Sequence, residues 1–270
     1  MPELPEIVNL ARQMHKELRG KKIVQVSVRQ EKCLNVPVED FESLVKGKTI
    51  GPVASRGKWL FTKLEPGAWF LLNLGMGGDV LYHKPGKTLP DKYQVRLDFD
   101  DHSVLTIRFW WFGYAHAVAQ SDLKTHQMTS TLGLSPIEGE EFDYESFSAL
   151  LEGRRGNIKS FLTNQKVVAG IGNVYIQDIL FAARLHPGRK IPDISDTERK
   201  KLFFAIRDNL KHAVDLGGLA YEKDLYNRPG RLKDFSVGYR EGKPCPECGA
   251  PIEKIKTGST ASFICPRCQT

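Results

Sequence analysis

The chain has 270 residues, of which 41% are hydrophobic and 26% are charged, and its 39 Lys and Arg outnumber its 32 Asp and Glu. This composition excludes a disordered chain, and the length accommodates two domains of ordinary size. The net charge of +7 suits a polyanionic partner, although many basic proteins never contact nucleic acid. Two glutamates stand where a secretory signal would be basic, and no apolar run is long enough for a bilayer, so we expect a soluble cytoplasmic protein.

The first half of the chain predicts one helix followed by β structure. Residues 2–18 have prolines near the start, acids in the first turn and apolar residues at helical spacing, and Gly20 ends the pattern. From Lys22 to about Ala119, short β-forming runs alternate with Gly, Pro, Asp and Asn, which is typical of a sandwich or barrel. The runs are 23–28, 49–54, 59–64, 69–74, 94–99 and 103–109.

The second half predicts helices and a small terminal module. Residues 129–141 have the composition of a linker, and residues 219–239 have no clear period and predict a loop. Helical patterns occupy 143–153, 157–165, 173–185 and 195–217. The expected class is therefore α+β, with a helix and β-sandwich in 1–128, a linker at 129–141, a helical domain at 142–236 and a terminal module at 237–270.

The terminal module contains four cysteines with metal-ligand spacing. Two C-x₂-C pairs are separated by sixteen residues, and they comprise Cys245, Cys248, Cys265 and Cys268. Four thiolates suit one tetrahedral zinc ion and leave no open position, so we expect a structural zinc. Two disulfides are the alternative, and they fit a secreted protein better. Cys33 remains as the single unmatched cysteine.

A turn of small residues, 169–172, lies between two predicted helices and leads into Asn173, which is placed to cap the second helix. A helix N-terminus exposes backbone N–H groups to an anion, and a DNA phosphate is a natural occupant. An ordinary glycine-rich helix connection explains the turn equally well.

The N-terminus offers a nucleophile. Methionine before a small residue such as Pro2 is normally removed, which leaves the secondary amine of proline free. An α-amine titrates at about 8, so part of it is unprotonated at neutral pH and able to attack C1′ of a nucleotide. Glu3 stands beside it as a candidate general acid and base. Taken alone, the same residues are simply a good beginning for a helix.

Five motifs occur together in one order: MPELPE at the start, RGK at 56–58, LGMGG at 74–78, GIGNVY at 170–175 and the Cys₄ module ending in CPRCQ. In this combination the whole chain resembles the formamidopyrimidine-DNA glycosylase and endonuclease VIII family. The resemblance implies an N-terminal helix with a β-sandwich, then a helix–two-turn–helix domain with a zinc finger. It also implies a bacterial-type monomeric enzyme, associated with the nucleoid, that excises a damaged base from double-stranded DNA and nicks the abasic strand.

The resemblance assigns roles to individual residues. Pro2 matches the nucleophile, Glu3 the general acid and base, and Lys58 the basic residue that contacts phosphate and assists the chemistry. The remaining matches are expected in the DNA interface: Glu6 as a second acid near the site, Met76 as the residue that fills the void of a flipped base, Phe112 as a wedge, Asn173 as a phosphate contact, and Lys159. Met76, judged alone, is as well explained as a core residue.

One departure from the family lies in the loop that enters the duplex. The family usually reads Asp-Pro-Arg-Arg-Phe-Gly there, whereas residues 108–113 read Arg-Phe-Trp-Trp-Phe-Gly. Trp110 and Trp111 therefore replace two arginines, one of which normally faces the base opposite the lesion. Two indoles can stack on bases, at about 1–3 kcal/mol per base. The alternative is that either indole packs in the sandwich core, since adjacent strand residues face opposite sides.

A second departure lies in the zinc finger, where Thr260 stands at the position of a phosphate-binding arginine. The sequence therefore supports β-elimination better than δ-elimination, although Lys256 lies close enough in sequence to supply the missing positive charge. The loop 219–236 does not match the pattern that covers an extruded oxoguanine, and its basic residues form either a phosphate-facing strip or a solvated loop. A protein that binds lesions without chemistry, and an enzyme retuned to alkylated bases, remain the alternatives.

Overall fold

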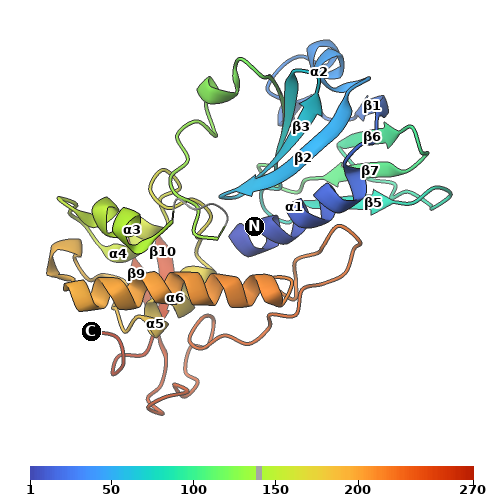
Figure 1. Ribbon diagram of the computed structural model, residues 1–270. Helices are drawn as coiled ribbons and strands as arrows, with labels where there is room; N and C mark the ends of the chain where they lie inside the picture. The colour runs from blue at the N-terminus through green and yellow to red at the C-terminus, as the bar shows by residue number, and fades with distance from the viewer. Residues whose placement is uncertain (138–141) are drawn as a thin grey trace. The chain divides into compact units, whose positions relative to one another are not determined.

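The computed structural model describes residues 1–137 and 142–270, which form two compact units (Figure 1). Unit 1 comprises Met1–Thr131 and Leu216–Leu232, and unit 2 comprises Leu132–Asp215 and Lys233–Thr270. The expected α+β class, with an N-terminal helix, a β-sandwich and a helical part that ends in a small hairpin, is confirmed.

Unit 1 contains α1 (Leu4–Leu18) and two four-stranded antiparallel sheets. One sheet has the order β1 (Ile23–Val28), β6 (Val95–Phe99), β7 (Val104–Arg108), β5 (Asp79–His83). The other has the order β2 (Thr49–Arg56), β3 (Trp59–Glu65), β4 (Ala68–Asn73), β8 (Tyr114–Ala119). Two short 3₁₀ helices, Glu31–Cys33 and Leu123–Thr125, lie in the connections.

The core of unit 1 joins α1 to both sheets. Ile7, Leu10 and Met14 occupy one face of α1 and are at most 1% exposed, as the helical period of the sequence predicts. They belong to one apolar cluster with Leu60 of β3 and Leu97 of β6. In Figure 1, α1 runs along β2. This packing fixes the position of the N-terminal residues that precede α1.

The β-rich stretch from Lys22 to Ala119 also contains a helix that the sequence analysis missed. Residues Val38–Val45 form α2, which Pro37 precedes as the N-cap residue. Phe41 and Val45 of this helix are buried in the core of unit 1. Their spacing with Val38 is that of a helix face, but a helix of two turns carries a weak periodic signal among β runs.

Unit 2 is mainly helical. It contains α3 (Tyr144–Leu151), α4 (Ile158–Leu162), α5 (Tyr175–Ala182), a 3₁₀ turn at Ile191–Asp193 and the long α6 (Asp196–Asp215). A two-stranded hairpin of β9 (Glu253–Thr257) and β10 (Thr260–Ile264) completes it. Phe263 of the hairpin packs with Phe181 of α5 and Val237 around the cysteines.

Two boundaries differ from those expected. Residues 132–134 of the expected linker are part of unit 2, because Leu134 pairs in parallel with Val168 and the Ala169 N–H donates to the Leu134 carbonyl at 2.8 Å. Residues 138–141 of that linker lie outside the described part of the chain. The segment Leu216–Leu232, expected in the helical domain, belongs to unit 1. Across the described residues, none of the helices is both long and apolar enough to cross a membrane.

Candidate active site, nucleic-acid interface and metal centre

The N-terminal residues form a buried acidic cluster at the start of α1. Pro2 is buried, and Glu3 and Glu6 are only 3% and 4% exposed. Glu3 is the N-cap of α1 and forms a reciprocal capping box with Glu6, whose Oε2 accepts from the Glu3 N–H at 2.8 Å. The capping box fixes both carboxylates beside the chain end. Pro2 and Glu3, the expected nucleophile and acid, therefore lie together in a structured site.

The segment Leu216–Leu232 closes over this cluster. The other Glu6 oxygen, Oε1, accepts from the Leu219 N–H at 3.0 Å. Gly218 has φ +88°, and a Cβ there would lie 2.7 Å from Glu6 Oε1, so only glycine permits the approach. Glu6 therefore ties the segment to the start of α1, rather than offering a free carboxylate to DNA.

Glu222, which the sequence analysis did not single out, is carried by the same segment. Its side chain is 10% exposed, and its Oε1 lies 3.4 Å from the α-amine of Met1. Burial raises the pKa of the Glu222 carboxyl and the nearby Glu3 raises it further, while the α-ammonium opposes both. No spacing in the sequence pairs residue 222 with residue 1, because the fold alone brings them together.

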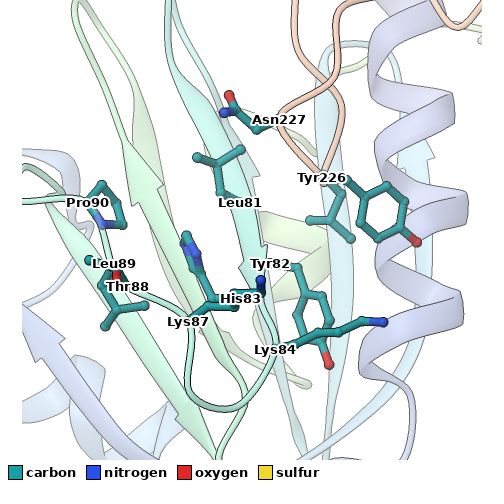
Figure 2. A pocket seen from close by; sticks show the side chains of 11 residues that line it. Leu81, Tyr82, His83, Lys84, Lys87, Thr88, Leu89, Pro90, Tyr226 and Asn227 are labelled. Atoms are coloured by element: carbon teal, nitrogen blue, oxygen red, sulfur yellow. The ribbon is translucent and has the colours of Figure 1, made fainter.

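The far end of the segment is held against α1 and β5. Leu225 donates its N–H to Gln13 Oε1 at 2.9 Å, and its carbonyl accepts from the Tyr82 N–H at 2.9 Å. The Tyr226 hydroxyl donates to Glu17 Oε1 at 2.7 Å, and burial followed by this carboxylate raises the pKa of Tyr226 to about 12. Figure 2 shows Tyr226 and Asn227 beside Leu81 and Tyr82 of β5. Residues from both segments line a cavity of about 470 Å³. The segment Leu216–Leu232, in a stretch expected to be a loop that either faces phosphate or is solvated, is thus a fixed part of unit 1.

Lys58 lies in the tight turn between β2 and β3, where Gly57 has φ +57°. The side chain of Asn73, at the end of β4, connects this turn to the next one. Its Nδ2 donates to the Lys58 carbonyl at 3.0 Å, and its Oδ1 accepts from the Gly75 N–H at 3.0 Å. Asn73 therefore fixes the backbone from which both Lys58 and the 74–78 loop project.

Four large apolar side chains form an exposed patch on unit 1, which we call the aromatic tip. Met76, Trp110, Trp111 and Phe112 are exposed by 48%, 65%, 61% and 72%. The Met76 N–H donates to the Trp111 carbonyl at 2.9 Å, which joins the two loops. The alternatives in which Met76 or either indole packs in the core are therefore wrong. Contiguous exposed aromatics indicate a binding surface.

The aromatic tip is held by close backbone packing. A Cβ at Gly75 would lie 2.1 Å from the Trp111 carbonyl oxygen, and a Cβ at Gly113 would lie 1.9 Å from the Phe109 ring. Phe112 adopts φ +54°, which is uncommon for a bulky residue. The tip is therefore a defined projection with its apolar side chains in solvent.

Asn173 lies in unit 2 just before α5, which begins at Tyr175 with Val174 as the N-cap residue. The expectation that Asn173 caps this helix is therefore wrong. Its carbonyl instead accepts from Gln177 Nε2 at 2.9 Å. The preceding turn is organised by Gln165, whose Oε1 accepts from the Gly170 N–H and whose Nε2 donates to the Ile171 carbonyl, both at 2.8 Å.

Lys159 connects α4 to the terminal hairpin. The side chain is 2% exposed, and its Nζ donates to Thr260 Oγ1 at 2.9 Å, to the Ala261 carbonyl at 2.6 Å and to Ser262 Oγ at 2.8 Å. Burial lowers the pKa of Lys159 to about 8. With three acceptors inside the unit, Lys159 anchors the hairpin rather than presenting its charge to DNA. Lys256, on the same hairpin, is exposed.

The four expected zinc ligands converge. Their Sγ atoms all lie within 4.8 Å of one another, with Cys245 and Cys268 at 3.9 Å and Cys248 and Cys265 at 3.4 Å. A zinc ion with Zn–S bonds of about 2.3 Å places its tetrahedral thiolates about 3.8 Å apart, so the arrangement fits zinc. The fifth cysteine, Cys33, is buried in unit 1, and burial raises its pKa to about 11.

Comparisons with known proteins agree with this arrangement. Family models match three successive parts of the chain: the formamidopyrimidine-DNA glycosylase N-terminal domain over residues 1–109, the formamidopyrimidine-DNA glycosylase H2TH domain over residues 132–224, and the zinc finger found in FPG and IleRS over residues 242–270. The last match and the sulfur geometry together identify the cysteine cluster as a structural zinc site.

Relatives and solved structures cover the whole chain. Proteins named formamidopyrimidine-DNA glycosylase from Pelobacter propionicus and Xanthomonas oryzae pv. oryzae are 33% and 34% identical to it over 100% of both chains. The wild-type Lactococcus lactis Fpg (MutM) in complex with DNA containing N7-benzyl-Fapy-dG superposes with a TM-score of 0.90 at 26% identity, over 99% of each chain. The Lactococcus lactis Fpg with DNA containing an abasic site gives 0.89 at 25% identity, over 99% of each chain. The chain therefore belongs to the formamidopyrimidine-DNA glycosylase family.

Proposed function

We propose that this base-excision repair DNA glycosylase attacks C1′ of a damaged nucleotide with the α-amine of Pro2 and then nicks the strand by β-elimination. The observation that carries the proposal is the buried cluster at the start of α1, where Pro2 precedes the capping box of Glu3 and Glu6. A secondary amine fixed beside carboxylates has both the nucleophile and the proton-transfer groups that the reaction needs. Removal of Met1 is a requirement of this mechanism.

The other expected residues have supporting roles in the proposal. Glu3 protonates the departing base and later exchanges protons during elimination. Lys58, on its fixed turn between β2 and β3, contacts a phosphate of the lesion strand, and Asn173 and Lys256 contact other phosphates. The aromatic tip enters the duplex at the vacated position and stacks on neighbouring bases, as apolar wedges do in distorted DNA.

Thr260 has a neutral side chain, and its hydroxyl accepts a hydrogen bond from the buried Lys159. We therefore expect β-elimination as the main cleavage, with little δ-elimination. We also propose that the enzyme acts as a monomer on double-stranded DNA in the cytoplasm. The DNA complexes among its structural relatives support the choice of DNA as the partner.

The test is a cleavage and trapping screen. Duplexes carrying 8-oxoguanine, formamidopyrimidine, an oxidised pyrimidine, an alkylated purine or an abasic site are incubated with the enzyme in the presence of borohydride. We expect a covalent adduct with the abasic site and with at least one lesion, and Pro2→Gly should reduce trapping by at least about 100-fold. Pro52→Ala, at an exposed proline of β2, is the matched control and should trap normally.

Two outcomes would contradict the proposal. Undiminished trapping by Pro2→Gly would exclude Pro2 as the nucleophile. Tight binding to lesion DNA with neither adduct nor cleavage would instead assign the chain to binding without chemistry. Activity on the alkylated purine alone would keep the mechanism and change the substrate class.

A further inference from the structure

A third buried carboxylate faces the end of the chain. Glu222 is buried, and its Oε1 lies 3.4 Å from the α-amine of Met1. It lies on the segment Leu216–Leu232, which directly follows α6 in sequence but packs in unit 1. A buried carboxylate against a terminal amine is costly unless the two groups interact specifically.

The position of Glu222 is fixed by its backbone. Its N–H donates to the Leu219 carbonyl at 3.0 Å, and its own carbonyl accepts from the Gly230 N–H at 3.2 Å. The Leu219 N–H in turn donates a hydrogen bond to Glu6 Oε1 of α1. The turn that carries Glu222 is thus tied directly to the helix that carries Pro2 and Glu3.

The three carboxylates of the cluster are not equivalent. Glu6 uses one oxygen to bond the Glu3 backbone and the other to bond the Leu219 backbone. Glu3 is the N-cap and takes part in the capping box. Glu222 forms an ion pair with the terminal amine. The geometry therefore separates a tethering acid, Glu6, and a capping acid, Glu3, from Glu222, which contacts the α-amine of Met1 next to Pro2.

We propose that Glu222 is the proton acceptor for the attacking α-amine, an inference that rests on the proposed function of Pro2. When the nitrogen lone pair forms the N–C1′ bond, the C1′–base bond breaks and the base leaves with that electron pair and a proton from an acid such as Glu3. The nitrogen then carries a positive charge and one hydrogen. Glu222 takes that proton, which returns the lone pair to nitrogen. The lone pair can then form the C=N bond as the C1′–O4′ bond opens, and O4′ takes the proton that Glu222 had accepted.

Burial supports this assignment, because it raises the pKa of the Glu222 carboxyl and so makes the carboxylate a stronger base than an exposed glutamate. In the resting protein the α-ammonium opposes this rise in pKa, and the amine attacks in its unprotonated form. Removal of Met1 shortens the chain by one residue and leaves the reactive nitrogen within the same buried cluster, since Pro2 itself is buried.

The test measures single-turnover base excision and borohydride trapping by Glu222→Gln. The variant keeps the shape of the side chain but cannot accept the proton, so we expect both rates to fall by about 100-fold or more. The dissociation constant for uncleaved lesion DNA and the melting temperature should stay close to those of the unmodified enzyme. Glu222→Asp retains the carboxylate and should react at an intermediate rate. Glu39→Gln, at an exposed acid of α2, is the control and should react normally.

The proposal is overturned if Glu222→Gln reacts at the normal rate, or if its slow reaction is accompanied by equal losses of DNA binding and thermal stability. Should the Gln variant fail to fold, a normal rate for Glu222→Asp would overturn it instead. Pro2→Gly, measured alongside, separates the two claims. If Glu222→Gln reacts normally while Pro2→Gly loses trapping, the role of Glu222 as proton acceptor is excluded and Pro2 remains the nucleophile. If Pro2→Gly traps normally, the proposed function itself is excluded.

Discussion

Glu3 and Glu6 are both buried at the start of α1, yet they have different roles, and only the structure separates them. The sequence places both acids in the first turn of a helix, where either could be a cap or a catalytic group. The hydrogen bond from Leu219 to Glu6 identifies Glu6 as the tether of a distant segment. Lys159 is a similar case, since it was expected in the DNA interface, whereas its three acceptors on the hairpin hold its charge inside unit 2.

A pair of histidines in unit 1, one of them buried, makes stability depend on pH. His116 on β8 is 6% exposed, and its Nδ1 lies 2.9 Å from His126 Nε2. Burial, and secondarily His126, lowers the pKa of His116 to about 4. His116 is therefore protonated near pH 6.5 in the unfolded chain but only near pH 4 in the folded chain. The free energy of unfolding should fall by about 3 kcal/mol as the pH drops through this window.

Urea unfolding of the unmodified protein and of His116→Leu between pH 4 and pH 7 checks this effect. The variant should lose less stability on acidification, because it no longer contains the histidine that resists protonation. His212→Gln, at an exposed histidine of α6, should retain the full loss. Equal acid slopes for His116→Leu and the unmodified protein would show that the pair does not govern acid stability.

Secondary structure was predictable where an element is long or strongly periodic. The first and last long helices, α1 and α6, and the strand Ile23–Val28 occur close to the expected positions. The two-turn α2 was missed because a short helix gives few periodic positions. The segment Leu216–Leu232 was expected to be a loop of the helical domain, since nothing local records that Gln13, Glu17 and Tyr82 bind it.

At the scale of the exposed loops, we expect the aromatic tip to contribute to DNA affinity by stacking. Trp110 and Trp111 are more than 60% exposed, so truncating them leaves the core of unit 1 intact. We expect Trp111→Ala and Trp110→Ala each to weaken binding to lesion duplexes by about 1–3 kcal/mol, with similar losses for every base placed opposite the lesion. Titrations of duplexes that differ only in the opposite base measure this.

Phe204→Ala, at a 46% exposed aromatic of α6, controls for the loss of exposed apolar surface and should bind normally. A loss confined to one opposite base would show that an indole reads that base specifically. Unchanged affinity in both tryptophan variants would exclude the tip from the interface.

The terminal hairpin depends on its metal. β9 and β10 are five residues each, and the apolar cluster around them includes three of the four cysteines and only a few other buried side chains. Such a small module is stabilised mainly by the ion, so removal of zinc should unfold it. After chelation, hydrogen exchange should accelerate in β9 and β10 while the strands of unit 1 stay protected. Unchanged protection of the hairpin would contradict a structural role for zinc.

At the scale of the whole molecule, the net charge of +7 supplies attraction to DNA but no selectivity. Binding to undamaged duplex should therefore weaken steeply with salt, as counterion release requires. We expect selectivity to come from two local features of unit 1, the N-terminal cluster and the aromatic tip. The charge and the order of the motifs could be taken directly from the sequence. The contact of Glu222 with the terminal amine could not, because it depends on the return of the chain into unit 1.

The central claim is that the terminal amine of Pro2 forms the bond to the sugar. Mass spectrometry of the borohydride-trapped adduct, after digestion of protein and DNA, tests it most directly. The account predicts that Met1 is absent and that the reduced sugar fragment is attached to the N-terminal peptide at Pro2. Attachment to a lysine such as Lys58, or an adduct on a chain that retains Met1, would contradict it.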